Sequence, residues 1–157
     1  MISKVVLDSY AVLAYFYEEQ GSDSLKNLLN LAKQNKANVY FNEINLGEAY
    51  YRVWKDSGEV AGKEALQLCL GLPIEVVSVD REFIIKAAEI KAQNKVSYAD
   101  AFCVATAKRE KCPVVTGDPE FASVRDLEII WIKDLKVVVQ SNHLKQSQKE
   151  EGEKNIQ

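Results

Sequence analysis

The sequence predicts an α/β fold, built on a mainly parallel sheet of five strands with helices covering both faces. Short apolar runs alternate with helical segments along the chain. The helical segments are long enough to serve as crossovers between parallel strands. The chain has 157 residues and shows neither an internal repeat nor a dividing linker, so a single domain is expected.

The first part of the chain alternates twice between strand and helix. Residues 4–8 form an apolar run that ends in an acid, and residues 11–18 have the length and apolar content of a helix. Leucines at helical spacing predict a second helix over residues 25–36. Residues 38–41 then predict the second strand.

The rest of the chain supplies four helices and three strands, each bounded by capping or turn residues. Ser97 and Asp100 form a capping-box pattern, and Pro119 follows Asp118 as in a capped helix start. The expected elements are a helix from about Asn42 to before Ser57, a helix over 59–70, a strand over 74–78, a helix from Asp80 to about Gln93, a helix from Ser97, and strands over 113–116 and 128–132.

Composition limits the domain organisation and the function. Residues 1–140 are predicted to form the folded domain, and the polar residues 141–157 a disordered tail. The only histidine, His143, falls in that tail, which excludes histidine acid/base catalysis from the folded body. The net charge of −3 disfavours a nucleic-acid binder that relies on basic patches. No segment is typical of a membrane span or signal peptide, so a cytoplasmic protein is expected.

Four acids occupy positions that a parallel sheet can bring together, although each has a structural alternative. Asp8 and Asp118 end predicted strands, where α/β sheets bind ligands, but both are also suited to cap a helix. Asp100 lies in a first helical turn and can act in the capping box. Glu48 is inside a helix, opposite an apolar stripe that runs from Leu46 to Trp54, where a solvated surface acid is the alternative.

Four carboxylates in one site would repel one another strongly unless a cation lay between them. An all-oxygen ligand set favours Mg²⁺ or Mn²⁺. Zinc is disfavoured because no histidine is available and no cysteine occupies these positions. Such ions clamp phosphate oxygens and activate water, which would replace the missing protein base.

Four stretches of the sequence carry a family resemblance: "VLDSYAVLAYF", "NEINLGEAYYRV", "VSYADAFCVATAKRE" and "PVVTGDPEF". In their order and spacing they resemble the corresponding stretches of the PIN-domain ribonucleases, and among these the VapC-type toxins. The resemblance implies a three-layer α/β/α domain. It also implies that four catalytic acids hold one or two divalent ions, with polar support from neighbouring residues. The acids are Asp8, Glu48, Asp100 and Asp118, and the supports are Ser9, Asn45 and Thr116.

Glu120 could be a further supporting acid in the manner of some family members, or simply a first-turn helix acid. The resemblance further implies hydrolysis of RNA that leaves a 5′-phosphate and a 3′-hydroxyl, a homodimer, and inhibition by a VapB-type antitoxin. Two alternatives remain open at this point. One is a non-catalytic RNA- or protein-binding module on the same fold. The other is a phosphoacceptor signalling domain, although Asp8 lacks the neighbouring acid that such a domain needs and Lys133 is its only candidate lysine.

Overall fold

The computed structural model describes residues 3–136, so the predicted tail and His143 lie outside the described residues. The elements are β1 (Lys4–Leu7), α1 (Ser9–Phe16), α2 (Ser22–Lys33), β2 (Asn38–Asn42), α3 (Glu43–Ser57), α4 (Glu59–Gly71), β3 (Glu75–Val77), α5 (Arg81–Gln93), α6 (Tyr98–Glu110), β4 (Val114–Thr116), the 3₁₀ helix η1 (Pro119–Ser123), β5 (Ile129–Trp131) and the 3₁₀ helix η2 (Ile132–Asp134). None of these helices combines the length and apolar character needed to cross a membrane.

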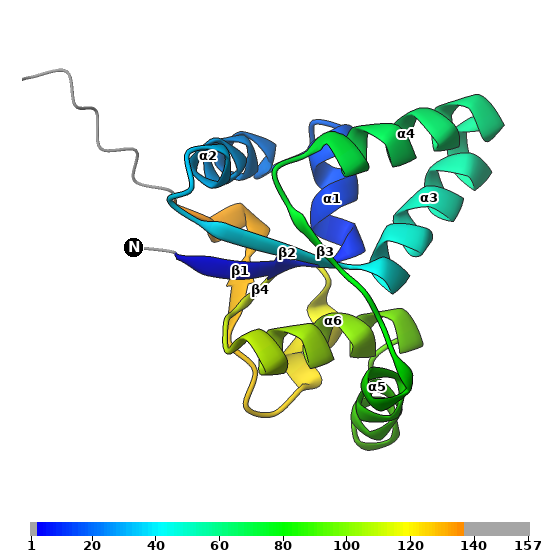
Figure 1. Ribbon diagram of the computed structural model, residues 1–157, viewed down its shortest axis with the longest axis vertical. Coiled ribbons are helices and arrows are strands. Elements are labelled where there is room, and N and C mark those ends of the chain that lie inside the picture. The colour runs from blue at the N-terminus through cyan, green and yellow to red at the C-terminus, as the bar shows by residue number, and fades with distance from the viewer. Residues whose placement is uncertain (1–2, 137–157) are drawn as a thin grey trace, which may run out of the picture.

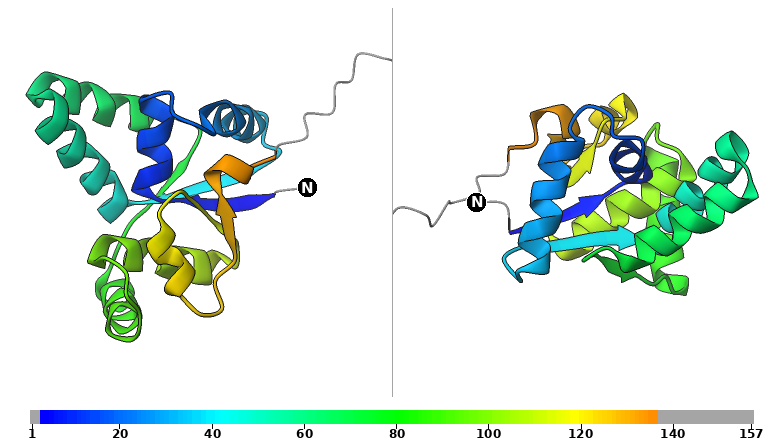
Figure 2. Two further views of the ribbon diagram at one scale, coloured as in Figure 1. Left: turned by 180° about the vertical axis from the view of Figure 1, so that it is seen from behind. Right: turned by 90° about the horizontal axis from the view of Figure 1, so that it is seen from above.

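The five strands form one sheet in the order β3-β2-β1-β4-β5, and every neighbouring pair is parallel. Helices α1 to α4 lie on one side of the sheet and α5 and α6 on the other (Figure 1). The predicted α/β class and the three-layer arrangement are therefore confirmed, with a sheet that is entirely parallel. The view from behind in Figure 2 shows η1 on the α6 side and η2 on the opposite side.

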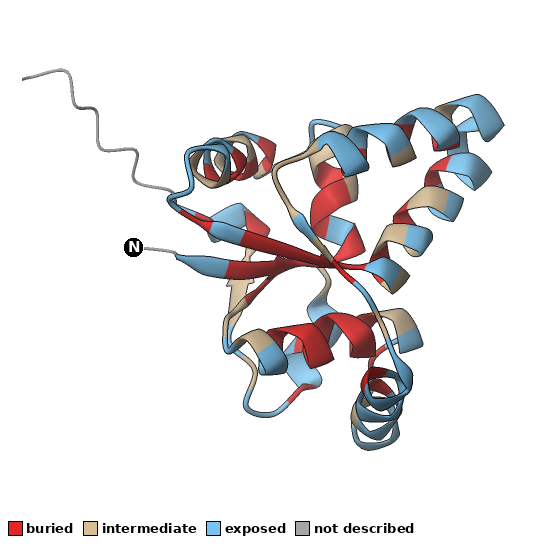
Figure 3. Ribbon diagram, in the orientation of Figure 1, coloured by how far each residue is buried: buried red, intermediate tan, exposed pale blue. Residues whose placement is uncertain are grey.

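Alternate residues of the central strands pack into two separate hydrophobic cores, one on each face of the sheet. In β1, Val5 and Leu7 join the core under α1 and α2, whereas Val6 joins the core under α5 and α6. Phe41 and Tyr40 divide between the two cores in the same way in β2. Successive side chains of a strand point to opposite faces, which is why a continuous apolar run suits a strand covered on both sides. Figure 3 shows the resulting buried band along the central strands.

Two helices begin and end two or three residues earlier in the structure than the sequence predicts. Helix α1 begins at Ser9 because Asp8 caps it, and the chain leaves the helix before Glu18, whose φ is 53°. Helix α2 begins at Ser22, directly after Gly21 with φ 92°. A left-handed glycine allows a sharp entry into a helix that the leucine spacing alone could not locate.

The predicted apolar stripe of α3 is only partly buried. Ala49 and Val53 are buried, whereas the side chain of Trp54 is 39% exposed. The reason is visible in Figures 1 and 3, where the α3–α4 hairpin extends beyond the edge of the sheet and leaves its far end exposed. Gly62 of α4 faces Trp54, and a Cβ at this glycine would lie 2.9 Å from the Trp54 Cβ.

Candidate metal centre at the carboxyl end of the sheet

Asp8 is the buried anchor of the site. It follows β1 directly, caps α1, and is only 1% exposed. Its Oδ1 accepts a hydrogen bond from the Ala11 backbone N–H at 2.9 Å, and its Oδ2 accepts one from the Thr116 hydroxyl at 2.6 Å. The capping alternative for Asp8 is therefore correct, and the same carboxylate is also tied to the end of β4.

The Thr116 hydroxyl links two of the four acids. It donates to Asp8 and accepts a hydrogen bond from the Asp118 backbone N–H at 2.9 Å. Asp118 caps η1, because its Oδ1 accepts from the Glu120 backbone N–H at 2.9 Å. The ends of β1 and β4 are thus joined through one side chain, as expected for adjacent parallel strands.

Asp100 lies in the first turn of α6 and is 5% exposed. Its backbone N–H donates to the Ser97 hydroxyl at 3.0 Å, and its Oδ2 accepts from the Ser97 backbone N–H at 3.3 Å. The predicted capping box is confirmed. The carboxylates of Asp100, Asp118 and Glu120 also lie within 4.8 Å of one another, so capping directs Asp100 toward other acids.

Replacing Ser97 by alanine should separate the structural role of the capping box from the acidic cluster. The variant loses the acceptor for the Asp100 N–H, so its free energy of unfolding should fall by about 1 kcal/mol. Denaturant unfolding followed by circular dichroism measures the change. An unchanged unfolding midpoint would contradict the structural role assigned to the Ser97 hydroxyl.

Glu48 and Asn45 approach the site from α3, and both carry an oxygen without a partner. The Glu48 side chain is 13% exposed, with Oε1 at 3.3 Å from Nη1 of Arg52. Glu48 Oε2 and Asn45 Oδ1 are buried and have no hydrogen-bond partner among the described residues. Asn45 Nδ2 donates to the Ala99 carbonyl at 3.0 Å, which fixes α3 against the start of α6.

Partnerless buried oxygens beside buried acids fit a cation, because each such oxygen otherwise carries an uncompensated desolvation cost. Glu48 is not the solvated surface acid that the sequence left as an alternative, because its side chain is largely buried. Only the first part of this face of α3 is covered, at Asn45 and Glu48, where α3 meets the start of α6, whereas Arg52 further along the helix is exposed. Arg52 was not singled out by the sequence patterns, although its i+4 spacing from Glu48 is the signal that predicts the contact.

The acids influence one another electrostatically. Burial raises the pKa of Asp8 to about 7, against the lowering effect of the hydrogen bonds from Thr116 and Ala11. The charges of Asp100 and Asp118 raise it further. Burial also raises the pKa of Asp100, and the charges of Glu48 and Asp118 act in the same direction. Each of the four predicted acids is therefore within electrostatic reach of another, which is the condition that favours binding of a cation.

The two remaining supporting residues, Ser9 and Glu120, differ in their relation to the acids. Ser9 is buried directly after Asp8, but no hydrogen bond among residues 3–136 joins its hydroxyl to one of the acids. Glu120, expected as a supporting or helix-turn acid, has its carboxylate in the cluster with Asp100 and Asp118. Glu120 is exposed, so it forms the solvent side of this cluster.

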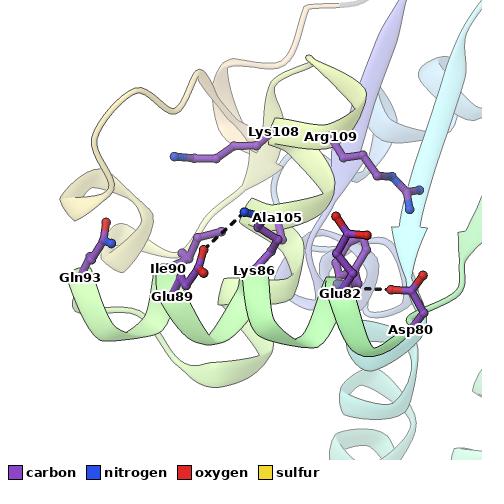
Figure 4. A pocket seen from close by; sticks show the side chains of 10 residues that line it. Asp80, Glu82, Lys86, Glu89, Ile90, Gln93, Ala105, Lys108 and Arg109 are labelled. Carbon is purple, nitrogen blue, oxygen red and sulfur yellow. Dashed lines mark hydrogen bonds and ion pairs between the residues drawn. The ribbon is translucent and has the colours of Figure 1, made fainter.

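A cavity of about 540 Å³ between α5 and α6 lies apart from these acids. Figure 4 shows side chains of both charges around it: Lys108 and Arg109 extend from α6 in opposite directions above α5, which carries Glu82, Lys86 and Glu89. The Arg109 guanidinium lies 5.1 Å from the centre of the Phe83 ring. None of the predicted site residues lines this cavity, so the carboxylate cluster remains the candidate centre.

The fold and the site define a class of protein: an α/β/α domain with an entirely parallel sheet and buried carboxylates gathered at the carboxyl end of its strands. The family model of the PIN domain matches residues 5–127. The chain belongs to the PIN domain family. No curated protein matches the sequence.

Solved structures support the same fold. VapBC2 from Rickettsia felis, bound to a DNA fragment from its promoter, matches with a TM-score of 0.64 and 19% identity over 81% of this chain and 97% of that one. DNA-bound VapBC from Salmonella typhimurium matches with a TM-score of 0.64 and 18% identity over 83% and 98%. VapC20 from Mycobacterium tuberculosis, described as a toxin that cleaves the sarcin-ricin loop, matches with a TM-score of 0.59 and 17% identity over 75% and 92%.

Proposed function

We propose that this chain is a metal-dependent endoribonuclease and the toxin of a VapBC-type toxin–antitoxin pair. The observation that carries the proposal is the partnerless Oε2 of Glu48, whose charge acts on the buried Asp100, which in turn repels the buried Asp8. Membership of the PIN domain family and the likeness to VapC structures support the reaction class. The substrate is RNA, hydrolysed to leave a 5′-phosphate and a 3′-hydroxyl.

Four residues would hold one or two Mg²⁺ or Mn²⁺ ions: Asp8, Glu48, Asp100 and Asp118. When bound, such an ion supplies Lewis acidity, which neutralises phosphate oxygens and makes water a better nucleophile. The oxygen-only donor set suits these hard cations and contains no nitrogen or sulfur ligand for zinc.

The chain's own groups hold this arrangement in place before a substrate arrives. Thr116 fixes the Asp8 carboxylate through its hydroxyl and the start of η1 through the Asp118 N–H. Asn45 fixes α3 to the start of α6, which sets the position of Glu48 relative to Asp100. Fixed ligands lose little conformational freedom when a cation binds, which is the advantage of a preorganised site.

The proposal includes partners. We expect a VapB-type antitoxin that covers the acidic groove, a homodimer, and activity in the cytoplasm. Several of the similar structures are toxin–antitoxin complexes, which supports the first of these expectations. A non-catalytic module on the same fold is the second candidate, and it predicts RNA binding without strand scission. A phosphoacceptor domain is disfavoured because Asp8 has no neighbouring acid.

Removing the divalent cation should abolish cleavage. The full chain, incubated with a single-stranded RNA in Mg²⁺ or Mn²⁺, should produce fragments with 5′-phosphate ends. Excess EDTA should stop the reaction, because no histidine lies among residues 3–136 to act as a base instead. Mapping of both fragment ends measures the outcome. Undiminished cleavage in EDTA, or 2′,3′-cyclic phosphate ends, would contradict the proposed chemistry.

A further inference from the structure

A second cavity opens at the same end of the sheet as the acids, and its volume is about 550 Å³. We call it the Tyr10 pocket. Helix α1, the loop after β4, β5 and η2 all contribute to it. Its lining includes Tyr10, Gln20, Gly117, Pro119, Trp131 and Lys133.

Several residues that line the Tyr10 pocket are close neighbours in the sequence of the predicted metal ligands. Gly117 and Pro119 flank Asp118 on either side, and Tyr10 lies two residues after Asp8. The Tyr10 ring rests directly on Gly117, because a Cβ at this glycine would collide with the ring. The ring is thus held in place by the strand end that carries Asp118, while the residue remains 40% exposed.

The pocket combines aromatic surface with charges of both signs, from Lys133 and from Glu19 and Asp134. Trp131 is half-buried at the end of β5, and Lys133 follows in η2. No carboxylate of the described residues lies within ion-pair distance of the Lys133 amine. Gly21 holds η2 close to the α1–α2 loop, since a Cβ there would lie 2.6 Å from the Ile132 carbonyl oxygen. The aromatic rings and the lysine are therefore presented on a fixed framework.

We propose that the Tyr10 pocket binds a nucleobase of single-stranded RNA next to the phosphate that is cleaved. This inference rests on the proposed ribonuclease function and names a subsite for its substrate. Aromatic side chains beside a cationic group are the combination that binds unpaired nucleotides, by stacking on the base and attraction to the backbone. The exposed Glu19 and Asp134 also line the pocket and offer acceptors for the amino groups of a base.

Trp131 allows this subsite to be tested by fluorescence. The chain has two tryptophans, so Trp54→Phe leaves Trp131 as the only one. Combining it with Asp8→Asn should keep the RNA uncut in Mg²⁺. The probes are fluorescein-labelled oligoadenylate and oligouridylate of about 12 nucleotides. Binding to the full chain is followed by anisotropy of the label and by Trp131 emission, with each reading taken on the same titration.

In this background, RNA should change the emission of Trp131, and Tyr10→Leu should weaken the Kd by about tenfold or more. Tyr10→Phe keeps the stacking ring and the contact with Gly117, so its Kd should stay unchanged. Tyr17→Ala, an exposed tyrosine outside the pocket, is the matched control. Lys133→Ala should lower the slope of log Kd against log salt by about 0.7, whereas Lys136→Ala should leave it unchanged.

Three outcomes would overturn the subsite, and the first two of them leave the proposed function untouched. RNA that binds equally well to Tyr10→Leu, with no change in Trp131 emission, excludes the pocket and leaves the ribonuclease intact. A Trp131 response to a partner peptide and not to RNA assigns the pocket to a protein. Absence of RNA binding and of cleavage overturns both. Conversely, Tyr10-dependent binding without any cleavage by the wild-type chain supports the subsite and contradicts the proposed function.

Discussion

Asp8→Asn is expected to lower the rate of RNA cleavage by at least about a thousandfold, because the divalent ion supplies several kcal/mol of charge stabilisation in such reactions. Asparagine has nearly the same shape and keeps an acceptor oxygen for the Ala11 N–H, so the fold should be retained. Single-turnover cleavage of a labelled RNA measures the rate, and circular dichroism the fold.

A matched control separates this effect from a general effect of removing a negative charge. Asp56 is an exposed acid near the end of α3 and is not part of the candidate centre. Asp56→Asn should cleave at the wild-type rate, whereas Asp100→Asn should be as inactive as Asp8→Asn. Full activity of Asp8→Asn would remove Asp8 from the metal site and return it to a purely capping role.

Stability should decrease as the pH rises from about 4 to 7, in the absence of divalent cations. The pKa of Asp8 is raised from its ordinary value of 3.8 to about 7 by burial, so between these values the folded state keeps a proton that the unfolded state has lost. The free energy of unfolding should therefore fall through this range by about 4 kcal/mol and level off above it. The raised pKa of Asp100 acts in the same direction.

Thermal unfolding at a series of pH values, in EDTA and in Mg²⁺, measures this effect. Mg²⁺ should restore most of the lost stability at pH 8 and little at pH 5, because a cation competes with the protons of the acids. Asp8→Asn should flatten the profile and be more stable than the wild type at pH 8 in EDTA. A wild-type stability that rises with pH over this range would show that burial does not control the Asp8 carboxyl.

Local signals explain which parts of the fold could be predicted from sequence. Asp80, Ser97 and Asp118 each cap a helix in the structure as their sequence contexts indicate. The strands were located correctly because apolar runs bounded by polar or turn residues are unambiguous when both faces are buried. The start of α2 was misplaced because it depends on the left-handed backbone of Gly21, which leucine spacing does not encode.

Some parts of the candidate site could likewise be predicted from the sequence, and others could not. Asp8 and Asp118 follow adjacent strands, so their proximity follows from the parallel topology alone. The environment of Glu48 could not be predicted, because its burial depends on α3 packing against α1 and α6, which are distant in the sequence. The same holds for the Tyr10 ring on Gly117. Periodicity identifies the apolar face of a helix but not which neighbours cover its polar face.

The most direct test of the central claim is an anomalous difference map from a crystal of the protein soaked in Mn²⁺. The account predicts a peak between the carboxylates of Asp8, Asp100 and Asp118, with Glu48 Oε2 directed toward it. The same soak of Asp100→Asn should give no peak. A Mn²⁺ peak elsewhere in the wild-type crystal, or an unoccupied carboxylate cluster in protein that cleaves RNA, would contradict the assignment of the metal centre.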